Sequence, residues 1–179
     1  MKSFGLWICV SAAVVWMGCT ESDLDPRSIK NGAYSNSAFG LSMTFPPVWQ
    51  FRTDQKYGDV VPDLVAIGPP IANFSPNVNI IAGAHSSSAD WATELPQIKT
   101  QILAQITDAT AWQDTVVVID GHDLARIEYE STQAGFLLHY RQYLLVNRGK
   151  QIVVTFSDRA AHFPANEDFP GIVASMRVY

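Results

Sequence analysis

The chain has 179 residues, 47% of them hydrophobic and 16% charged, and its 12 Lys and Arg against 17 Asp and Glu give a formal net charge of −5. This composition is typical of one packed globular domain and not of a disordered chain. An acidic chain without a run of Lys and Arg lacks the basic face that a phosphate backbone requires, so we expect no nucleic-acid partner. The two cysteines, Cys9 and Cys19, lie close to the N-terminus, which leaves the body of the chain without a disulfide, a thiolate metal site or a cysteine nucleophile.

The N-terminus has the pattern of an export signal. Met1 and Lys2 form a short positive start, and the apolar run of 14 residues from Phe4 to Met17 is shorter than the roughly 20 residues that a membrane-spanning helix needs. The run ends in Gly18-Cys19 before a polar, acidic stretch, and this arrangement resembles a bacterial lipoprotein signal.

The resemblance implies that residues 1–18 are a signal peptide that is removed and that Cys19 carries the lipid. In lipoproteins of this type the cysteine is diacylated and, in most bacteria with two membranes, also N-acylated. Two or more acyl chains hold a protein stably at a membrane. Trp16 and Met17 stand where such signals usually have an aliphatic and a small residue. An ordinary secretory signal, with Cys19 incidental, and an uncleaved short anchor are the alternatives.

We therefore expect a lipid-anchored protein on the periplasmic face of a bacterial cell envelope, with the membrane as one partner. Thr20 follows the cysteine in place of the Asp that favours inner-membrane retention in enteric bacteria, which favours the outer membrane if the cell has two. Residues 19–33 have few large apolar side chains and include Pro26 and Gly32, so we expect a flexible tether. Residues 34–179 then form the folded domain.

The first part of the domain is predicted to be β-structure. The stretch Ala33 to Phe45 reads as two strands around a turn at Asn36-Ser37, because its large apolar residues alternate with small or polar ones. Pro46-Pro47 ends this segment. Two further apolar strands are expected at residues 64–67 and 77–83, separated by Gly and Pro.

A helix is expected from about Ala89 to Thr107, with Ser87 and Ser88 as candidate N-caps. Pro96 lies inside this pattern and costs about 3 kcal/mol of helix propensity, so we expect either a kink there or a helix that starts near it. One apolar stripe at the helical period predicts the buried face: Trp91, Leu95, Ile98, Ile102 and Ile106.

Three consecutive strands are predicted between Asp123 and Ser157, after a strand at residues 115–119 and a tight turn at Asp120-Gly121. A second turn at Arg148-Gly149 pairs Asn147 with Lys150. This register sets which side chains share a face, since alternate residues of a strand point to opposite sides.

One face of this sheet is then continuously apolar, while the other is charged near Arg126 and Glu128 and apolar elsewhere. A sheet with apolar residues on both faces needs cover on both. The helix described above is one cover, and a shorter helix at about Asn166 to Ser175 is the other. The predicted fold is α+β: a mostly antiparallel sheet covered by helices on both faces, an α/β/α sandwich.

The order of these elements resembles that of PsbP-like domains. The matching segments cover residues 34–179: FGLSMTFPPVW after a Tyr-led strand, SPNVNII before the long helix, VVTFS, and the closing IVASMRVY. The resemblance implies the PsbP-like fold, which Ran-binding Mog-type import factors, DcrB-like lipoproteins and chaperones of type VI secretion effectors share. These relatives are binding and assembly modules and not enzymes. The acidic body differs from a photosystem subunit that docks through lysines, so that role is not expected here.

Neither a catalytic nor a metal site is expected. No pair of the four histidines has a spacing that places two ligands on one face, and no Gly-x-Ser-x-Gly motif is present. The residues that draw attention are Arg126 and Glu128 on one strand and His139 and Arg141 on the next, which form a cross-strand charged set. We interpret this set as a solvated face in the first place and as a candidate partner-binding patch in the second.

The leading functional hypothesis is a non-enzymatic, lipid-anchored binding or assembly module of the cell envelope, with a protein partner and no cofactor. One alternative is a periplasmic carrier of a small apolar ligand, which requires a dry pocket between the long helix and the sheet. The other is an envelope hydrolase, which requires a convergent polar site. The aromatic residues considered for the carrier's pocket are Phe45, Trp49, Phe51, Tyr57, Trp91 and Trp112.

Overall fold

The computed structural model describes residues 25–57, 59–85 and 88–179. The predicted signal peptide, Cys19 and the first part of the predicted tether lie outside these residues. The described elements are β1 (Arg27–Lys30), β2 (Ala33–Asn36), β3 (Leu41–Thr44), β4 (Gln50–Arg52), β5 (Leu64–Ile67), β6 (Asn77–Ala84), α1 (Trp91–Gln105), β7 (Thr110–Ile119), β8 (His122–Gln133), β9 (Phe136–Asn147), β10 (Lys150–Arg159), the 3-10 helix η1 (Phe163–Ala165), α2 (Asp168–Ala174) and β11 (Arg177–Val178).

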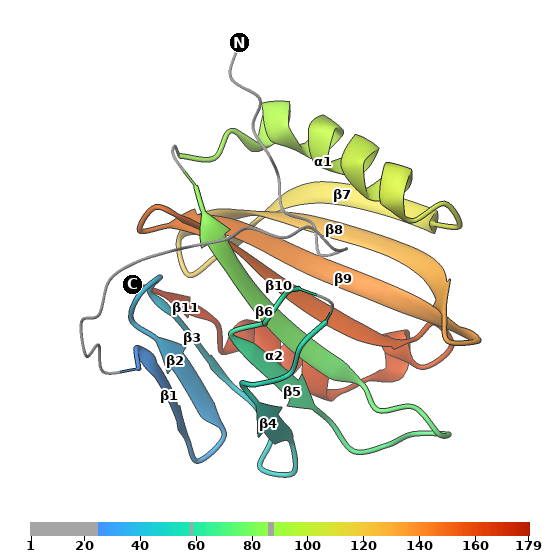
Figure 1. The fold of residues 1–179 in the computed structure, drawn as a ribbon, viewed down its shortest axis with the longest axis horizontal. Helices are drawn as coiled ribbons and strands as arrows, with labels where there is room; N and C mark the ends of the chain where they lie inside the picture. The colour runs from blue at the N-terminus through green and yellow to red at the C-terminus, as the bar shows by residue number, and fades with distance from the viewer. Residues whose placement is uncertain (1–24, 58, 86–87) are drawn as a thin grey trace.

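The centre of the molecule is a seven-stranded sheet in the order β4-β5-β6-β10-β9-β8-β7 (Figure 1). Every neighbouring pair in it is antiparallel. The predicted meander is confirmed, including the pairing of Asn147 with Lys150 and of Leu145 with Ile152. Strand β10 joins this meander to β6, so the early and late strands of the chain form one sheet.

Tight turns set the register of the meander. Asp120 and Gly121 have φ angles of 51° and 78°, and Arg148 and Gly149 have φ angles of 49° and 70°. Two-residue turns with positive φ at both positions are of the type whose twist matches that of antiparallel strands. The pairing of the residues that flank each turn follows directly, and with it the face on which each side chain lies.

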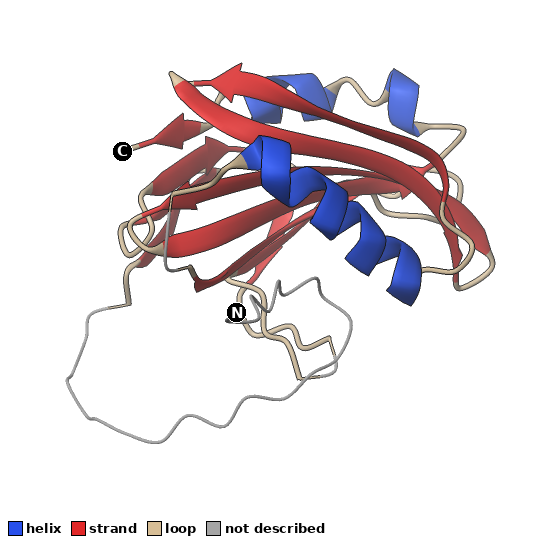
Figure 2. Ribbon diagram, turned by 90° about the horizontal axis from the view of Figure 1, so that it is seen from above, coloured by secondary structure: helices blue, strands red, loops and turns tan. Residues whose placement is uncertain are grey.

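Helix α1 covers one face of the β8–β9 region, and Figure 2 shows it on one side of the strands with α2 on the other. Its buried side chains Trp91, Leu95, Ile98 and Ile102 are those of the predicted stripe. They pack against Ala125, Ile127 and Tyr129 of β8 and Leu144 of β9.

The start of α1 differs from the prediction. Asp90 is the N-cap residue, Ser88 lies outside the helix, and the other candidate cap, Ser87, lies outside the described residues. The backbone N–H of Asp90 donates to Glu94 Oε1 at 3.0 Å, while Thr93 Oγ1 donates to Asp90 Oδ2 at 2.7 Å. These contacts lie in the first turn, and the helix continues through Pro96 instead of starting there.

The opposite face is covered by a second, four-stranded sheet in the order β1-β2-β3-β11, together with η1 and α2. The mixed, mostly antiparallel architecture is therefore as predicted. The expectation of helices as the cover on both faces needs correction, because α2 has only seven residues and shares this side with the second sheet. The shared core includes Tyr34, Leu41 and Met43 from the small sheet and Phe169 and Ile172 from α2.

The predicted tether ends too late in the sequence. Arg27–Lys30 already forms strand β1, which pairs with β2 around a turn at Asn31-Gly32. A Cβ at Gly32 would lie 2.7 Å from the carbonyl oxygen of Phe45, so the turn is packed against the domain. Residues 27–33 therefore belong to the folded domain. No helix among the described residues is long and apolar enough to cross a membrane.

Candidate functional site

The four predicted patch residues meet around one carboxylate, that of Glu128. Glu128 lies directly opposite Arg141 in the β8–β9 pairing, and Glu130 lies opposite His139. Glu128 Oε2 accepts from Arg141 Nη2 at 3.1 Å and contacts His139 Nε2 at 3.0 Å, while Glu128 Oε1 lies 3.2 Å from Arg126 Nε. The alternation of the two strands brings all four side chains to the face opposite α1.

The interpretation of this set as a solvated face is wrong for its centre. The Glu128 side chain is 9% exposed, against 35% for that of Arg126. Burial raises the pKa of Glu128, but the hydrogen bonds from Arg141 and His139 and the charges of Arg141 and Arg126 outweigh it, so the pKa lies below its ordinary value. The carboxylate is thus held ionised within a cationic surround.

The inner part of the cluster holds η1 against the sheet. The ring of Phe163 in η1 lies 4.1 Å from the His139 ring and 5.0 Å from the Arg141 guanidinium carbon. Arg141 Nε is buried without a hydrogen-bond partner among the described residues. His139 and Arg141 therefore have a structural role beneath Phe163, whereas Arg126 remains at the rim towards β7.

Beyond Arg126 the sheet ends at β7, whose outer side has no neighbouring strand among the described residues. Ile119 and His122 flank the two-residue turn and so form a hydrogen-bonded pair, which makes Val117–Leu124 and Thr115–Arg126 the next such pairs. The alternate residues Asp114, Val116 and Val118 then point their backbone N–H and C=O groups away from β8. We call these three residues the β7 edge.

On the α1 face the β7 edge presents two exposed valines, with the carboxylate of Asp114 at one end of the pair. Val116 is 45% and Val118 69% exposed, and both lie on this face because they pair with Ala125 and Asp123. Leu103 of α1, also exposed, stands one turn after Lys99, whose ammonium lies over the ring of Trp112 in β7. Positions four apart share a helix flank, so Leu103 is on the flank that overhangs β7.

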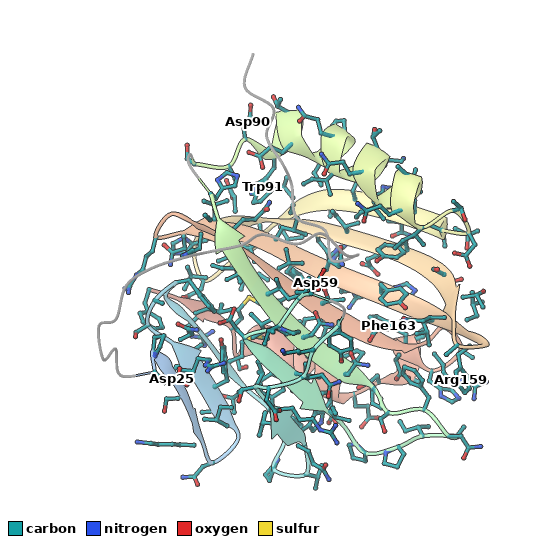
Figure 3. The ribbon with its side chains drawn as sticks, in the orientation of Figure 1. Asp25, Asp59, Asp90, Trp91, Arg159 and Phe163 are labelled. Atoms are coloured by element: carbon teal, nitrogen blue, oxygen red, sulfur yellow. The ribbon has the colours of Figure 1, made fainter. Side chains whose placement is uncertain are left out.

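The aromatic residues considered for a carrier pocket do not meet in one place. Phe45, Trp49 and Phe51 pack in the core between the main sheet and the small one, on the face away from α1. Trp91 of α1 and Trp112 of β7 belong to the core cluster on the other face, and Tyr57 is half exposed. Figure 3 shows Trp91 at the start of α1, apart from Phe163 of η1, which belongs to the core cluster on the opposite face.

The turn at Asp120-Gly121 has a structural role. Asp120 Oδ2 accepts a hydrogen bond at 2.9 Å from the backbone N–H of Val178, which ties the turn to β11. His122 beside it is exposed. Within the described ranges, no group of three or more His, Cys, Asp or Glu is arranged to hold a metal ion.

Sequence reasoning found Arg126 and its neighbours but missed the β7 edge. The run TVVVI predicted a strand, and its three valines were available as a signal. What the run could not reveal is that β10 inserts between β6 and β9, which leaves β7 at the end of the sheet.

Sequence comparison finds no matching protein-family profile and no matching curated protein. Solved structures do match. The solution structure of the cyanobacterial PsbP protein CyanoP from Synechocystis sp. PCC 6803 aligns with a TM-score of 0.61 and 20% identity, over 90% of this chain and 98% of that one. PA94 of Pseudomonas aeruginosa, described as a putative regulator, aligns at 0.51 and 19% identity over 70% and 82% of the two chains. LpqN of Mycobacterium tuberculosis, described as involved in cell envelope biogenesis, aligns at 0.53 and 9% identity over 77% and 82%.

Proposed function

We propose that this chain, which has the PsbP-like fold that its sequence predicts, is a non-enzymatic binding or assembly module of the cell envelope. At identities of 20% and below the similar structures support the fold alone. The envelope setting is supported by the export signal in the sequence. The binding role is inferred from the molecular surface.

The open β7 edge carries the proposal. Natural proteins protect a sheet edge with Lys, Pro, a bulge or a very short strand, because unpaired N–H and C=O groups are a template for another strand. Between Thr115 and Ile119 the edge has no charged residue and no proline, and its two outward valines are exposed. The irregularity of β7 lies further back, between Thr110 and Gln113. Such an edge is suited to a partner that adds a strand to the sheet.

The lipid anchor is part of the same proposal. Cys19 would be acylated and would hold the domain at the periplasmic face of the outer membrane or, in a cell with one membrane, at the outer side of that membrane. Mass analysis of the mature N-terminus tests this part directly. A terminus at Cys19 with the mass of two or three acyl chains supports it, and a free terminus at any other residue contradicts it.

In-cell crosslinking tests the binding role. A photo-crosslinking amino acid placed at Val118 should give one discrete adduct with an envelope protein, because this side chain borders the outer side of β7. The matched control is Val48, which is 65% exposed but lies in the connection between β3 and β4. Equal adduct patterns at Val118 and Val48, or none at Val118, would refute a partner at the β7 edge.

The carrier and the hydrolase gain no support from a specific observation. The side chains of α1 contact those of β8 and β9 directly, and Ile98, Ile102, Ile127 and Leu144 are all buried in that contact. The polar residues that do converge, around Glu128, are paired with one another. We therefore put forward the binding module alone.

A further inference from the structure

We infer that the occupant of the β7 edge is an extended segment of a partner protein that presents apolar side chains to one face of the sheet and a carboxylate to the other. This inference rests on the binding role proposed above and adds the chemistry of the partner. It follows from the different character of the two faces that meet at the edge. An added strand presents its side chains to both faces in turn.

The α1 face sets the apolar positions. A strand that pairs antiparallel to β7 would exchange backbone hydrogen bonds with Asp114, Val116 and Val118, the residues with outward backbone groups. The partner side chains opposite Val116 and Val118 would lie on the α1 face beside both valines. Cross-strand pairs of apolar side chains stabilise a sheet by about 0.2–1 kcal/mol each, and burial of the valines adds to this.

The opposite face sets one charged position, because Arg126 stands behind Thr115 while Val117 and Ile119 on the same face are apolar. The partner residue that follows the one opposite Val116 would lie on this face, opposite Thr115. Arg126 of β8 pairs with Thr115 from the other side of β7. With strands spaced about 4.8 Å apart, Arg126 is about 10 Å from the added strand, within the combined reach of an arginine and a glutamate. Arg126 contacts Glu128 through Nε, and among the described residues Glu128 is its one ion-pair partner. The fork geometry of a guanidinium leaves its Nη groups for a second carboxylate.

A second copy of the chain does not supply this chemistry. The acidic residue of β7 is Asp114, which pairs with Ile127 and so lies on the α1 face. In any antiparallel pairing of two β7 strands through their outward backbone groups, Thr115 would face Gln113, Thr115, Val117 or Ile119 of the copy, and none of these is acidic. Arg126 would therefore gain no carboxylate from the copy's β7. The charge pattern therefore favours a different protein.

Peptide binding to the full chain in detergent micelles tests the inference. The probes are two fluorescein-labelled nine-residue peptides, one alternating valine with glutamate and one alternating valine with lysine, read by fluorescence anisotropy. We expect the glutamate peptide to bind at least about tenfold more tightly. Arg126→Glu should reverse this order, and Arg126→Gln should reduce the ratio. The matched control is Arg52→Glu on β4, at the far edge of the sheet, which should leave the ratio unchanged.

Val118→Pro tests whether the β7 edge is the binding site, independently of whether the partner carries carboxylates. It removes an outward N–H that β8 does not use, so circular dichroism and urea unfolding should be near those of the natural chain. Loss of binding with this variant, together with the reversal by Arg126→Glu, supports the inference. If Val118→Pro abolishes binding but the natural chain binds both peptides equally, the carboxylate chemistry is overturned while the proposed function stands. If Val118→Pro leaves peptide binding intact, the β7 edge is not the site and both are overturned. A dimer seen by sedimentation that Val118→Pro dissociates would identify a second copy as the occupant and also overturn the inference.

Discussion

The two edges of the main sheet are built in opposite ways. Strand β4 has three residues, and just before it Trp49 is tied to α2 through a hydrogen bond from its Nε1 to Asp168 Oδ2 at 2.8 Å. Strand β7 has ten residues, and Val116 and Val118 near its C-terminal end are exposed. Short length protects the β4 edge, whereas the β7 edge is stabilised from within by α1 and β8 and left open outside. One sheet thus combines a short edge strand with a long open one, and it is the open edge that we propose for binding.

The largest expected effect comes from the cover beside the open edge. Ile102→Ala should lower the free energy of unfolding by about 2–5 kcal/mol, because the side chain is fully buried between α1 and the sheet and its loss leaves a cavity. Urea unfolding measures this. The adjacent Leu103→Ala is the control and should change stability by no more than about 0.5 kcal/mol, since Leu103 is exposed. Similar losses for the two variants would show that α1 does not hold the β7–β8 region as described.

A pair of proline variants tests which side of β7 is bonded. Val117→Pro should cost about 1–3 kcal/mol, because it removes a backbone N–H that pairs with Leu124 and leaves an acceptor unsatisfied. Val118→Pro, one residue on, should cost far less. Amide hydrogen exchange gives the same contrast without mutation: the Val117 amide should be protected and the Val118 amide should exchange rapidly. Comparable protection of both amides would contradict the assignment of the outward groups.

At the closed edge, Asp168→Ala should cost about 1–2 kcal/mol, because the buried indole N–H of Trp49 loses its acceptor. Asp168→Asn keeps an acceptor oxygen and should cost less. Binding of the glutamate peptide should be unaffected by either change once both variants are shown to be folded. A change in peptide affinity would mean that the two edges are coupled.

The smallest effect is on acid stability. The pKa of Glu128 is lower in the folded chain than its ordinary value of 4.5, so Glu128 stabilises the fold above that pH, and the contribution is lost as the pH falls through the folded pKa. Asp63 acts in the opposite sense, because burial raises its pKa and favours its protonated form. Glu128→Gln should therefore flatten the decline of stability with falling pH below 4.5. An unchanged pH profile of urea midpoints would argue against the ion pairs around Glu128.

Local rules in the sequence were sufficient for the meander. The positive-φ turns at Asp120-Gly121 and Arg148-Gly149 set the pairing of the flanking residues, and period-two alternation then placed each side chain on its face. The buried stripe of α1 followed in the same way from the helical period. The start of α1 did not, because Ser88 and Asp90 are both good caps and only the contacts of Glu94 and Thr93 select Asp90.

Long-range packing decided the rest. The gathering of Arg126, Glu128, His139 and Arg141 was predictable from strand register, but the packing of Phe163 on His139 and Arg141 was not, because η1 comes from a later part of the chain. Strand β1 was mistaken for tether because its side chains are mostly polar and it is stabilised by pairing with β2.

By itself the sequence determined the antiparallel meander, the buried stripe of the long helix and the grouping of four charged residues, because these depend on periodicity and turn geometry within a few residues. Only the tertiary structure decided that β10 pairs with β6, that a second sheet shares the cover of the far face, and that β7 lies at an open edge. Those features depend on which strands find each other across the chain, and a strand carries no local mark of whether its outer side is paired.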